Sequence, residues 1–353
     1  MRGGIQHLVT RVAEHLPDAG VNVVAPAAVD AAEVDRGLPF RVWRAGLPAS
    51  RQASLAAVNA ATLRAARDFR PHVLLVAHVV CSPGATLAGR LFRTPVVQWF
   101  HSDELGARRS LSAFAYRRAT AVIAVSSHTR TLVAEVAGET AKVHVIPVGV
   151  DLPAVARNGT RAEPPTVLTV ARLEERYKGH DVLARALPLV RDRVPDARWV
   201  VVGDGPLRPV IQSLVKANGV ANAAVFAGAV SDAERDRWYA ASRVLAMPSR
   251  LPAGRLGGEG FGIVFLEAGA HGLPVVAGAA GGALDAVRDG ETGLLVDPGD
   301  HLAVADALVE LLSDTDKARR MGRAGRAFAD AHAWPLVAAR VEDVLLSVAQ
   351  RRR

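Results

Sequence analysis

Three consecutive segments decide the fold: TVLTV at residues 166–170, DVLARALPLVRDRV at 181–194 and WVVV at 199–202. The first and third are short runs rich in β-branched residues, which is typical of buried strands. The middle segment has the length and apolar spacing of a helix. A strand, a helix and a second strand in this order predict a parallel pair of strands joined by a crossover helix.

The same alternation continues outward over almost the whole chain, so the sequence predicts an α/β fold built on parallel sheets. Further strands are predicted at 21–25, 72–77, 95–100, 121–125, 143–147, 224–227, 244–247 and 274–277. Further helices are predicted over the apolar positions from Ile5 to Leu16, at 54–69, 129–137 and 302–312, and from about Trp334 to Ala349.

The chain divides into two similar halves. Its 353 residues favour two domains, and the stretch 151–165, rich in Pro, Gly and polar residues, is predicted to link them. In a doubly wound domain a strand normally feeds a glycine turn and then a helix. Here the predicted turn, Gly3-Gly4, opens the chain. The first half is therefore expected to lack its first strand.

Composition narrows the function classes. The chain contains one cysteine, Cys81, no apolar run long enough to span a membrane and no secretion signal, which together indicate a cytoplasmic protein. The formal charge of +8 suits anionic partners such as phosphate groups or an acidic membrane face, although heavy use of Arg explains it equally well. No nucleic-acid-binding motif occurs, and no nucleic-acid partner is expected.

The strongest motif is EGFGIVFLE, residues 259–267. A glycine-rich loop runs into an apolar helix, whose first N–H groups at Gly262, Ile263 and Val264 suit a diphosphate. The Glu267 carboxylate is placed to accept hydrogen bonds from ribose hydroxyls, and Glu259 to bond sugar hydroxyls. The alternative is an ordinary helix with a charged cap.

Two cations, Arg172 and Lys178, are candidates to stabilise the charge that a nucleoside diphosphate gains as it leaves. The alternative is a solvated, charged loop, because Glu174, Glu175 and Arg176 lie between them. His101 ends a predicted strand, at the edge where open α/β sheets bind ligands. Its alternative role is a hydrogen bond to a nearby backbone group.

Several further segments strengthen one resemblance. They are GGIQ (3–6), VIPVGVD (145–151), ARL (171–173) with KGHD (178–181), VVGDGP (201–206), GG (281–282) and GETGLL (290–295). Together with the two glutamates separated by seven residues, they resemble retaining glycosyltransferases of family 4. Arg2 to Gln6 and the loop from Arg250 to Gly258 are similar, within that family, to bacterial phosphatidylinositol mannosyltransferases.

The resemblance implies a GT-B fold, in which two Rossmann-like domains face each other across a cleft. Residues 1–152 would form the acceptor domain and 153–333 the nucleotide-sugar domain, with the helix in 334–353 packing back on the first. It implies transfer of a hexosyl group, mannosyl favoured, from a nucleotide diphosphate sugar to an acceptor hydroxyl with retained configuration. Catalytic roles fall on His101, Arg172, Lys178 and Glu259.

Donor-binding roles fall on a second set, made of Gly4, Val230, Gly262, Ile263, Val264 and Glu267. The donor is expected to be GDP-mannose or a UDP-sugar, and the acceptor a membrane lipid or a small polyol, with peripheral contact at the inner face of the membrane. No cofactor and no metal is expected. The string Asp314-Thr315-Asp316 is interpreted as a helix cap, not a metal site.

Two other classes stay open. A non-catalytic or truncated GT-B binding protein would account for the absent first strand, while the complete set of donor motifs opposes it. An NAD-dependent oxidoreductase is disfavoured, because neither half shows the glycine fingerprint between a strand and a helix with a later acidic residue.

Overall fold

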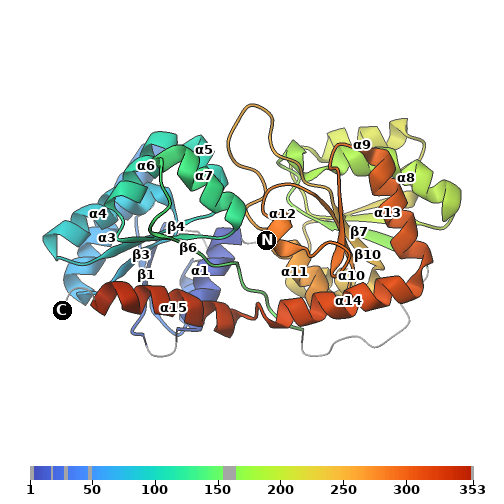
Figure 1. Ribbon diagram of the computed structural model, residues 1–353. Coiled ribbons are helices and arrows are strands. Elements are labelled where there is room, and N and C mark those ends of the chain that lie inside the picture. Colours follow the sequence, from blue (N-terminus) through green and yellow to red (C-terminus); the bar gives the residue numbers. More distant parts are fainter. Residues whose placement is uncertain (1–3, 17–18, 28–30, 47–49, 154–163, 351–353) are drawn as a thin grey trace. The chain divides into compact units, whose positions relative to one another are not determined.

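The computed structural model describes residues 4–16, 19–27, 31–46, 50–153 and 164–350. The chain forms two compact units (Figure 1). One is Val150–Ala333, and the other joins Arg2–Gly149 to Trp334–Arg353. The predicted linker 151–165 lies largely outside the described residues.

The unit containing Val150–Ala333 is built on a six-stranded sheet with the order β12-β11-β10-β7-β8-β9, in which every neighbouring pair is parallel. Its strands are β7 (Thr166–Val170), β8 (Arg198–Val202), β9 (Ala224–Gly228), β10 (Val244–Met247), β11 (Val275–Gly278) and β12 (Gly293–Val296). The chain moves outward from β7 to β9, then returns to the other side of β7 at β10. The order therefore reverses between β7 and β10.

Helices cover both faces of this sheet (Figure 1). They are α8 (His180–Arg193), α9 (Arg208–Ala217), α10 (Asp232–Ala241), α11 (Ile263–Ala270), α12 (Ala283–Ala286), α13 (His301–Ser313) and α14 (Thr315–Asp330), with the short turns η2 (Arg176–Lys178) and η3 (Ala221–Ala223). The side chains of Trp199, Leu183 and Leu308 are almost fully buried in one core cluster. Burial of that apolar surface is the main term that stabilises the unit.

The other unit has a parallel four-stranded sheet in chain order, β3-β4-β5-β6, and a separate parallel pair, β1-β2. The strands are β1 (Asn22–Ala25), β2 (Arg41–Arg44), β3 (Leu74–Val76), β4 (Val96–Phe100), β5 (Ala121–Ala124) and β6 (Val143–Val145). In the described part of the chain, no strand connects the β1-β2 pair to the four-stranded sheet through hydrogen bonds.

The helices of this unit are α1 (Gly4–Glu14), α2 (Ala31–Arg36), α3 (Arg51–Phe69), α4 (Ser82–Leu91), α5 (Asp103–Ala107), α6 (Arg109–Arg118), α7 (Ser127–Ala137) and α15 (Trp334–Gln350), with the short turn η1 (Val79–Cys81). The last helix packs against α1 (Figure 1). Trp334, at the start of α15, is buried and its ring meets His7 of α1 edge-on.

The prediction of an α/β fold on parallel sheets is confirmed, and each strand predicted from the sequence is present within one or two residues at most ends. Two strands are not predicted, β2 and β12. The prediction of a turn at Gly3-Gly4 is wrong for Gly4, because Gly4 is the first residue of α1. Gly3 lies outside the described residues.

Candidate functional site

All the predicted site residues except Gly4 and His101 belong to the unit with the six-stranded sheet, and several of them follow its strands. Arg172 and Lys178 follow β7, Val230 follows β9, and Glu259 follows β10. In an open parallel sheet, ligands bind outside the carboxyl ends of the strands where the strand order reverses. That point lies between β7 and β10, so Lys178 and Glu259 come from the two segments that flank it.

Helix α11 begins at Ile263, as the glycine-rich loop predicts, and is preceded by Gly262 in the left-handed conformation with φ 93°. A β-carbon at Gly262 would lie 2.5 Å from the ring of Phe265, so only glycine fits without displacing that ring. Phe265 N–H bonds the Gly262 carbonyl at 2.9 Å. The N–H groups of Ile263 and Val264 have no acceptor within the helix, which leaves the positive end of the helix dipole for an anion.

Lys178 and Glu259 form an ion pair across 81 positions of sequence. Their side chains are only 18% and 12% exposed, so water screens the pair little. The approach depends on Gly179, which has φ 80° and would place a β-carbon 2.3 Å from the Pro248 carbonyl oxygen. Glycine at 179 therefore lets the segment with Lys178 lie against the end of β10.

The Glu267 carboxylate lies on α11, one turn beyond the helix start. The hydroxyl of Tyr239, from α10, donates to its Oε2 at 2.7 Å, and Arg235 Nη1 is 3.9 Å from its Oε1. Tyr239 is fully buried, and burial together with the Glu267 charge raises the pKa of its phenol well above the usual value. The hydroxyl therefore remains a donor, and it fixes the orientation of the carboxylate.

Arg172 does not join this group of contacts. Its guanidinium pairs with Glu174 at 2.8 Å, and the two side chains are 60% and 47% exposed. This is the solvated loop that the sequence offers as the alternative. The structure thus brings Lys178, Glu259 and Gly262 together and places Glu267 on the same helix, while Arg172 is held at the same sheet edge by a surface pair.

Val230 lies two residues beyond β9 and is half-buried. Gly228, the last residue of that strand, accepts a hydrogen bond of 2.8 Å from Gly203 at the end of β8. The backbone around Val230 is thus anchored to the sheet edge that carries the other predicted donor residues.

The remaining two predicted residues belong to the other unit. His101 follows β4, and its Nε2 lies 2.9 Å from the Ala77 carbonyl oxygen. Because a carbonyl only accepts, Nε2 carries the proton. Burial lowers the His101 pKa to about 4, against the opposing effect of that hydrogen bond. The ring is therefore neutral at pH 7, with Nδ1 as an acceptor. Gly4 has open space where a β-carbon would be.

The sequence does not predict the contacts of Tyr239 and Arg235 with Glu267, or the ion pair between Asp181 and Arg250. These contacts join residues 28 to 69 positions apart in the chain, and no local pattern marks them.

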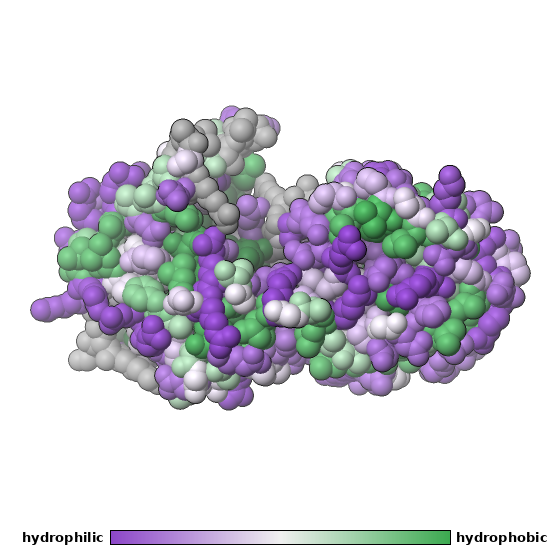
Figure 2. Space-filling model, turned by 90° about the horizontal axis from the view of Figure 1, so that it is seen from above, coloured by the Kyte–Doolittle hydropathy of each residue, from purple (hydrophilic) through white to green (hydrophobic). Residues whose placement is uncertain are grey.

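No group of three or more metal-ligating side chains occurs among the described residues. Asp314 caps α14, accepting from Lys317 N–H at 2.8 Å, so the interpretation of that string as a helix cap is confirmed. None of the helices in the described ranges combines the length and apolarity that a membrane crossing needs. The face seen in Figure 2 mixes hydrophilic and hydrophobic residues.

The fold resembles solved glycosyltransferase structures. The UDP-glucose complex of Anabaena Alr3699/HepE superposes with a TM-score of 0.80 at 23% identity, covering 98% of this chain and 97% of that one. Sucrose-phosphate synthase from Thermosynechococcus elongatus gives a TM-score of 0.79 at 23% identity, covering 99% and 94%. The protein therefore has the GT-B fold.

Sequence comparisons identify the family. Residues 2–153 match the model described as Glycosyltransferase Family 4, and residues 164–314 match Glycosyl transferases group 1. The GDP-mannose-dependent alpha-(1-6)-phosphatidylinositol monomannoside mannosyltransferase of Mycolicibacterium smegmatis is 35% identical over 98% of this chain and 95% of its own length. The chain therefore belongs to glycosyltransferase family 4.

A relative with the same name from Mycobacterium tuberculosis (strain CDC 1551 / Oshkosh) is 42% identical over 233 residues, which are 63% of this chain and 60% of its own length. The matched region thus spans less than two thirds of that relative.

Proposed function

We propose that this chain transfers a hexosyl group, with mannose favoured, from a nucleoside diphosphate sugar to an acceptor hydroxyl, retaining the anomeric configuration and using no metal or other cofactor. Residues 153–333 bind the donor and residues 1–152 the acceptor, with the helix of 334–353 packing on the latter. The observation that carries the proposal is the Lys178–Glu259 pair beside the open start of α11, at the point where the strand order reverses.

Charge explains how this site promotes transfer. As the glycosidic bond breaks, the diphosphate gains negative charge. The N–H groups of Ile263 and Val264 donate to it, and the Lys178 ammonium lies beside the same helix start. Arg172 adds a second cation once its surface pair with Glu174 opens, since such an exposed pair is weak. These positive groups do the work that a divalent metal does in other transferases.

Hydroxyl recognition falls on the carboxylates and on His101. Glu259 accepts from the donor sugar and Glu267 from the ribose, while the neutral His101 ring offers Nδ1 to a sugar hydroxyl. Val230 presents its backbone to the base, and Gly4, at the start of α1, leaves space for the substrate. No enzyme nucleophile is required when attack and departure occur on the same face and the leaving phosphate takes the acceptor proton.

The names of the relatives support GDP-mannose as the donor and a phosphatidylinositol lipid as the acceptor. The formal charge of +8 is compatible with peripheral contact at the anionic inner face of the membrane. A protein bound to that face lies in the cytoplasm. A UDP-sugar is the competing donor and a small polyol is the competing acceptor. The experiment below includes both.

The test incubates the full chain with GDP-mannose or UDP-glucose, and with phosphatidylinositol vesicles or free myo-inositol. The expected product is mannosylated phosphatidylinositol, with an α linkage that NMR identifies. A β-linked product would refute retention, and transfer to inositol alone would refute the lipid acceptor. Binding of sugar nucleotides without transfer to either acceptor would favour a non-catalytic GT-B binding protein.

A further inference from the structure

The turn that follows His101 has a backbone conformation that residues with a side chain rarely adopt. Within the described ranges, three residues other than glycine have a positive φ, namely Arg70, Arg93 and Ser102. Arg70 and Arg93, at 53° and 52°, have the φ of the ordinary left-handed region, whereas Ser102 has φ 122° and ψ −72°. A backbone this far from the allowed regions persists only where surrounding contacts fix it.

A buried carboxylate supplies such a contact. Glu104, in α5, is 7% exposed, and its Oε1 accepts a hydrogen bond from the His101 N–H at 2.5 Å. His101 lies one residue beyond the end of β4, so the carboxylate takes the place of a strand partner for that N–H. Burial raises the pKa of the Glu104 carboxyl, and the bond from the His101 N–H opposes that rise. The bond spans Ser102 and closes the turn.

Further hydrogen bonds hold the backbone of Glu104. Its carbonyl oxygen accepts from the Arg108 N–H at 2.9 Å and from the hydroxyl of Ser112, on α6, at 3.1 Å. Ser112 is fully buried. The Glu104 carboxylate therefore extends from a backbone that is itself fixed to α6.

The ring of His101 has separate contacts. Its Nε2 donates to the carbonyl of Ala77, one residue beyond β3, at 2.9 Å. The ring also stacks on buried Trp99, with ring centroids 5.8 Å apart and planes 27° apart. The ring contacts and the main-chain bond to Glu104 together determine where His101 Nδ1 lies.

We propose that Glu104 is a positioning residue for the transfer reaction: its carboxylate fixes the turn at Ser102 and so sets the place of the His101 ring against the donor sugar. Glu104 itself touches no reacting atom. The inference rests on the proposed function, because the contact between His101 and the donor sugar is taken from it.

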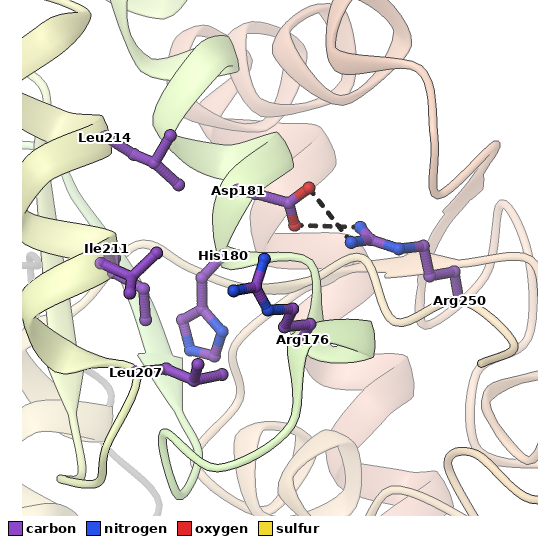
Figure 3. A pocket seen from close by; sticks show the side chains of 8 residues that line it. Arg176, His180, Asp181, Leu207, Ile211, Leu214 and Arg250 are labelled. Atoms are coloured by element: carbon purple, nitrogen blue, oxygen red, sulfur yellow. Dashed lines mark hydrogen bonds and ion pairs between the residues drawn. The ribbon is translucent and has the colours of Figure 1, made fainter. Parts of the chain in front are cut away.

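The partner of a carboxylate decides which substitution is conservative. In the other unit, the two oxygens of Asp181 each accept a hydrogen bond from the Arg250 guanidinium, at 3.0 and 3.1 Å (Figure 3). A carboxamide there would lose one acceptor and the charge. Glu104 Oε1 accepts from a neutral backbone N–H, for which one carboxamide oxygen is sufficient. Glu104→Gln therefore keeps the contact, and Glu104→Leu removes it with a side chain of similar size.

Hydrogen exchange measures the position of the ring directly. The Nε2 proton of His101 is followed by NMR in the full chain labelled with nitrogen-15, and its signal is assigned by its loss in His101→Ala. Slow exchange with water is expected in the unmodified chain and in Glu104→Gln, because the proton is bonded to the Ala77 carbonyl. Exchange about tenfold faster or more is expected in Glu104→Leu. Equal exchange in these three proteins would overturn the proposal.

Transfer kinetics test the consequence for the reaction. Glu104→Leu should lower kcat about tenfold or more, because the ring is misplaced. It should leave the affinity for GDP within about twofold, since GDP lacks the sugar. Glu104→Gln should stay within about threefold of the unmodified kcat. Val58→Ala, in the buried face of α3, controls for lost stability and should leave kcat unchanged. Equal losses of kcat in the Leu and Gln variants, or a parallel loss of GDP affinity, would contradict the positioning role.

A double variant separates positioning from a general loss of structure. If Glu104 acts through His101, then Glu104→Leu combined with His101→Ala is no slower than His101→Ala alone. A further loss of about tenfold in the double variant would overturn the proposal. If the unmodified chain transfers no sugar, the proposed function fails, and the exchange measurement still decides whether Glu104 positions the His101 ring.

Discussion

The Tyr239 hydroxyl donates to Glu267 Oε2 at 2.7 Å and so connects α10 to α11, the helix whose start forms part of the candidate donor site. The two side chains differ in environment, since Tyr239 is fully buried while the Glu267 side chain keeps 16% of its surface exposed. Glu267 can therefore accept from a substrate while Tyr239 holds it in place.

Tyr239→Phe tests this positioning role. Loss of a hydrogen bond to a charged group costs about 1–2 kcal/mol, which corresponds to a donor KM raised roughly five- to thirtyfold. We expect kcat to stay within about twofold, because the reacting atoms are contacted by other groups. Steady-state kinetics against the sugar nucleotide measure both constants. A fall in kcat at unchanged KM would contradict the role.

The cations are tested by Lys178→Ala and Arg172→Ala, each expected to slow transfer at least tenfold, or about 1.4 kcal/mol of transition-state stabilisation. Lys216→Ala provides the control, since Lys216 is a cation near the end of α9. The measurement is single-turnover transfer at saturating donor. Near-normal rates in both variants would remove the cations from the mechanism.

Gly179→Ala tests how the Lys178 segment is placed. The added methyl would lie 2.3 Å from the Pro248 carbonyl oxygen, at φ 80°. We expect a loss of about 2 kcal/mol or more in the free energy of unfolding, measured with urea. Gly138→Ala is the matched control, because its φ is 82° with no atom within 4 Å, and it should cost only about 1 kcal/mol. Equal losses would show that the close approach is unimportant.

Acid should destabilise the protein through His180. The His180 pKa is lowered to about 4 in the folded chain, against about 6.5 when unfolded. The unfolded state therefore binds the proton first, and stability falls as the pH drops from about 6.5 to 4. His180→Gln should reduce the loss of unfolding free energy between pH 7 and pH 5 by about 2 kcal/mol. An unchanged pH slope in urea titrations would contradict the assignment.

Removal of divalent cations tests metal independence. We expect transfer in excess EDTA to proceed at the rate seen with added Mg²⁺, within about twofold, because fixed cations and helix N–H groups meet the leaving diphosphate. An EDTA-sensitive rate that Mg²⁺ or Mn²⁺ restores would refute this part of the proposal.

The sequence predicts most of the strands, because runs such as Thr166–Val170 are rich in β-branched residues and buried along their whole length. It does not predict β2, where arginines at both ends of Arg41–Arg44 obscure a short strand. It does not predict β12 either, because that run of four residues, which begins with Gly293, is too short to separate from a loop.

The candidate site divides in the same way. The start of α11 is predicted because its signal is local, a glycine followed at once by apolar helical residues. The partners of the charged side chains are not local. Nothing near Glu267 in the sequence indicates Tyr239, and nothing near Arg172 decides between a substrate and Glu174.

The most direct test of the account is the affinity of GDP for the full chain and for Glu267→Ala and Lys178→Ala, measured by isothermal titration calorimetry. The account predicts saturable binding to the unmodified chain and a loss of at least tenfold, or about 1.4 kcal/mol, in each variant. Equal affinity in all three proteins would show that the nucleotide does not bind at the start of α11.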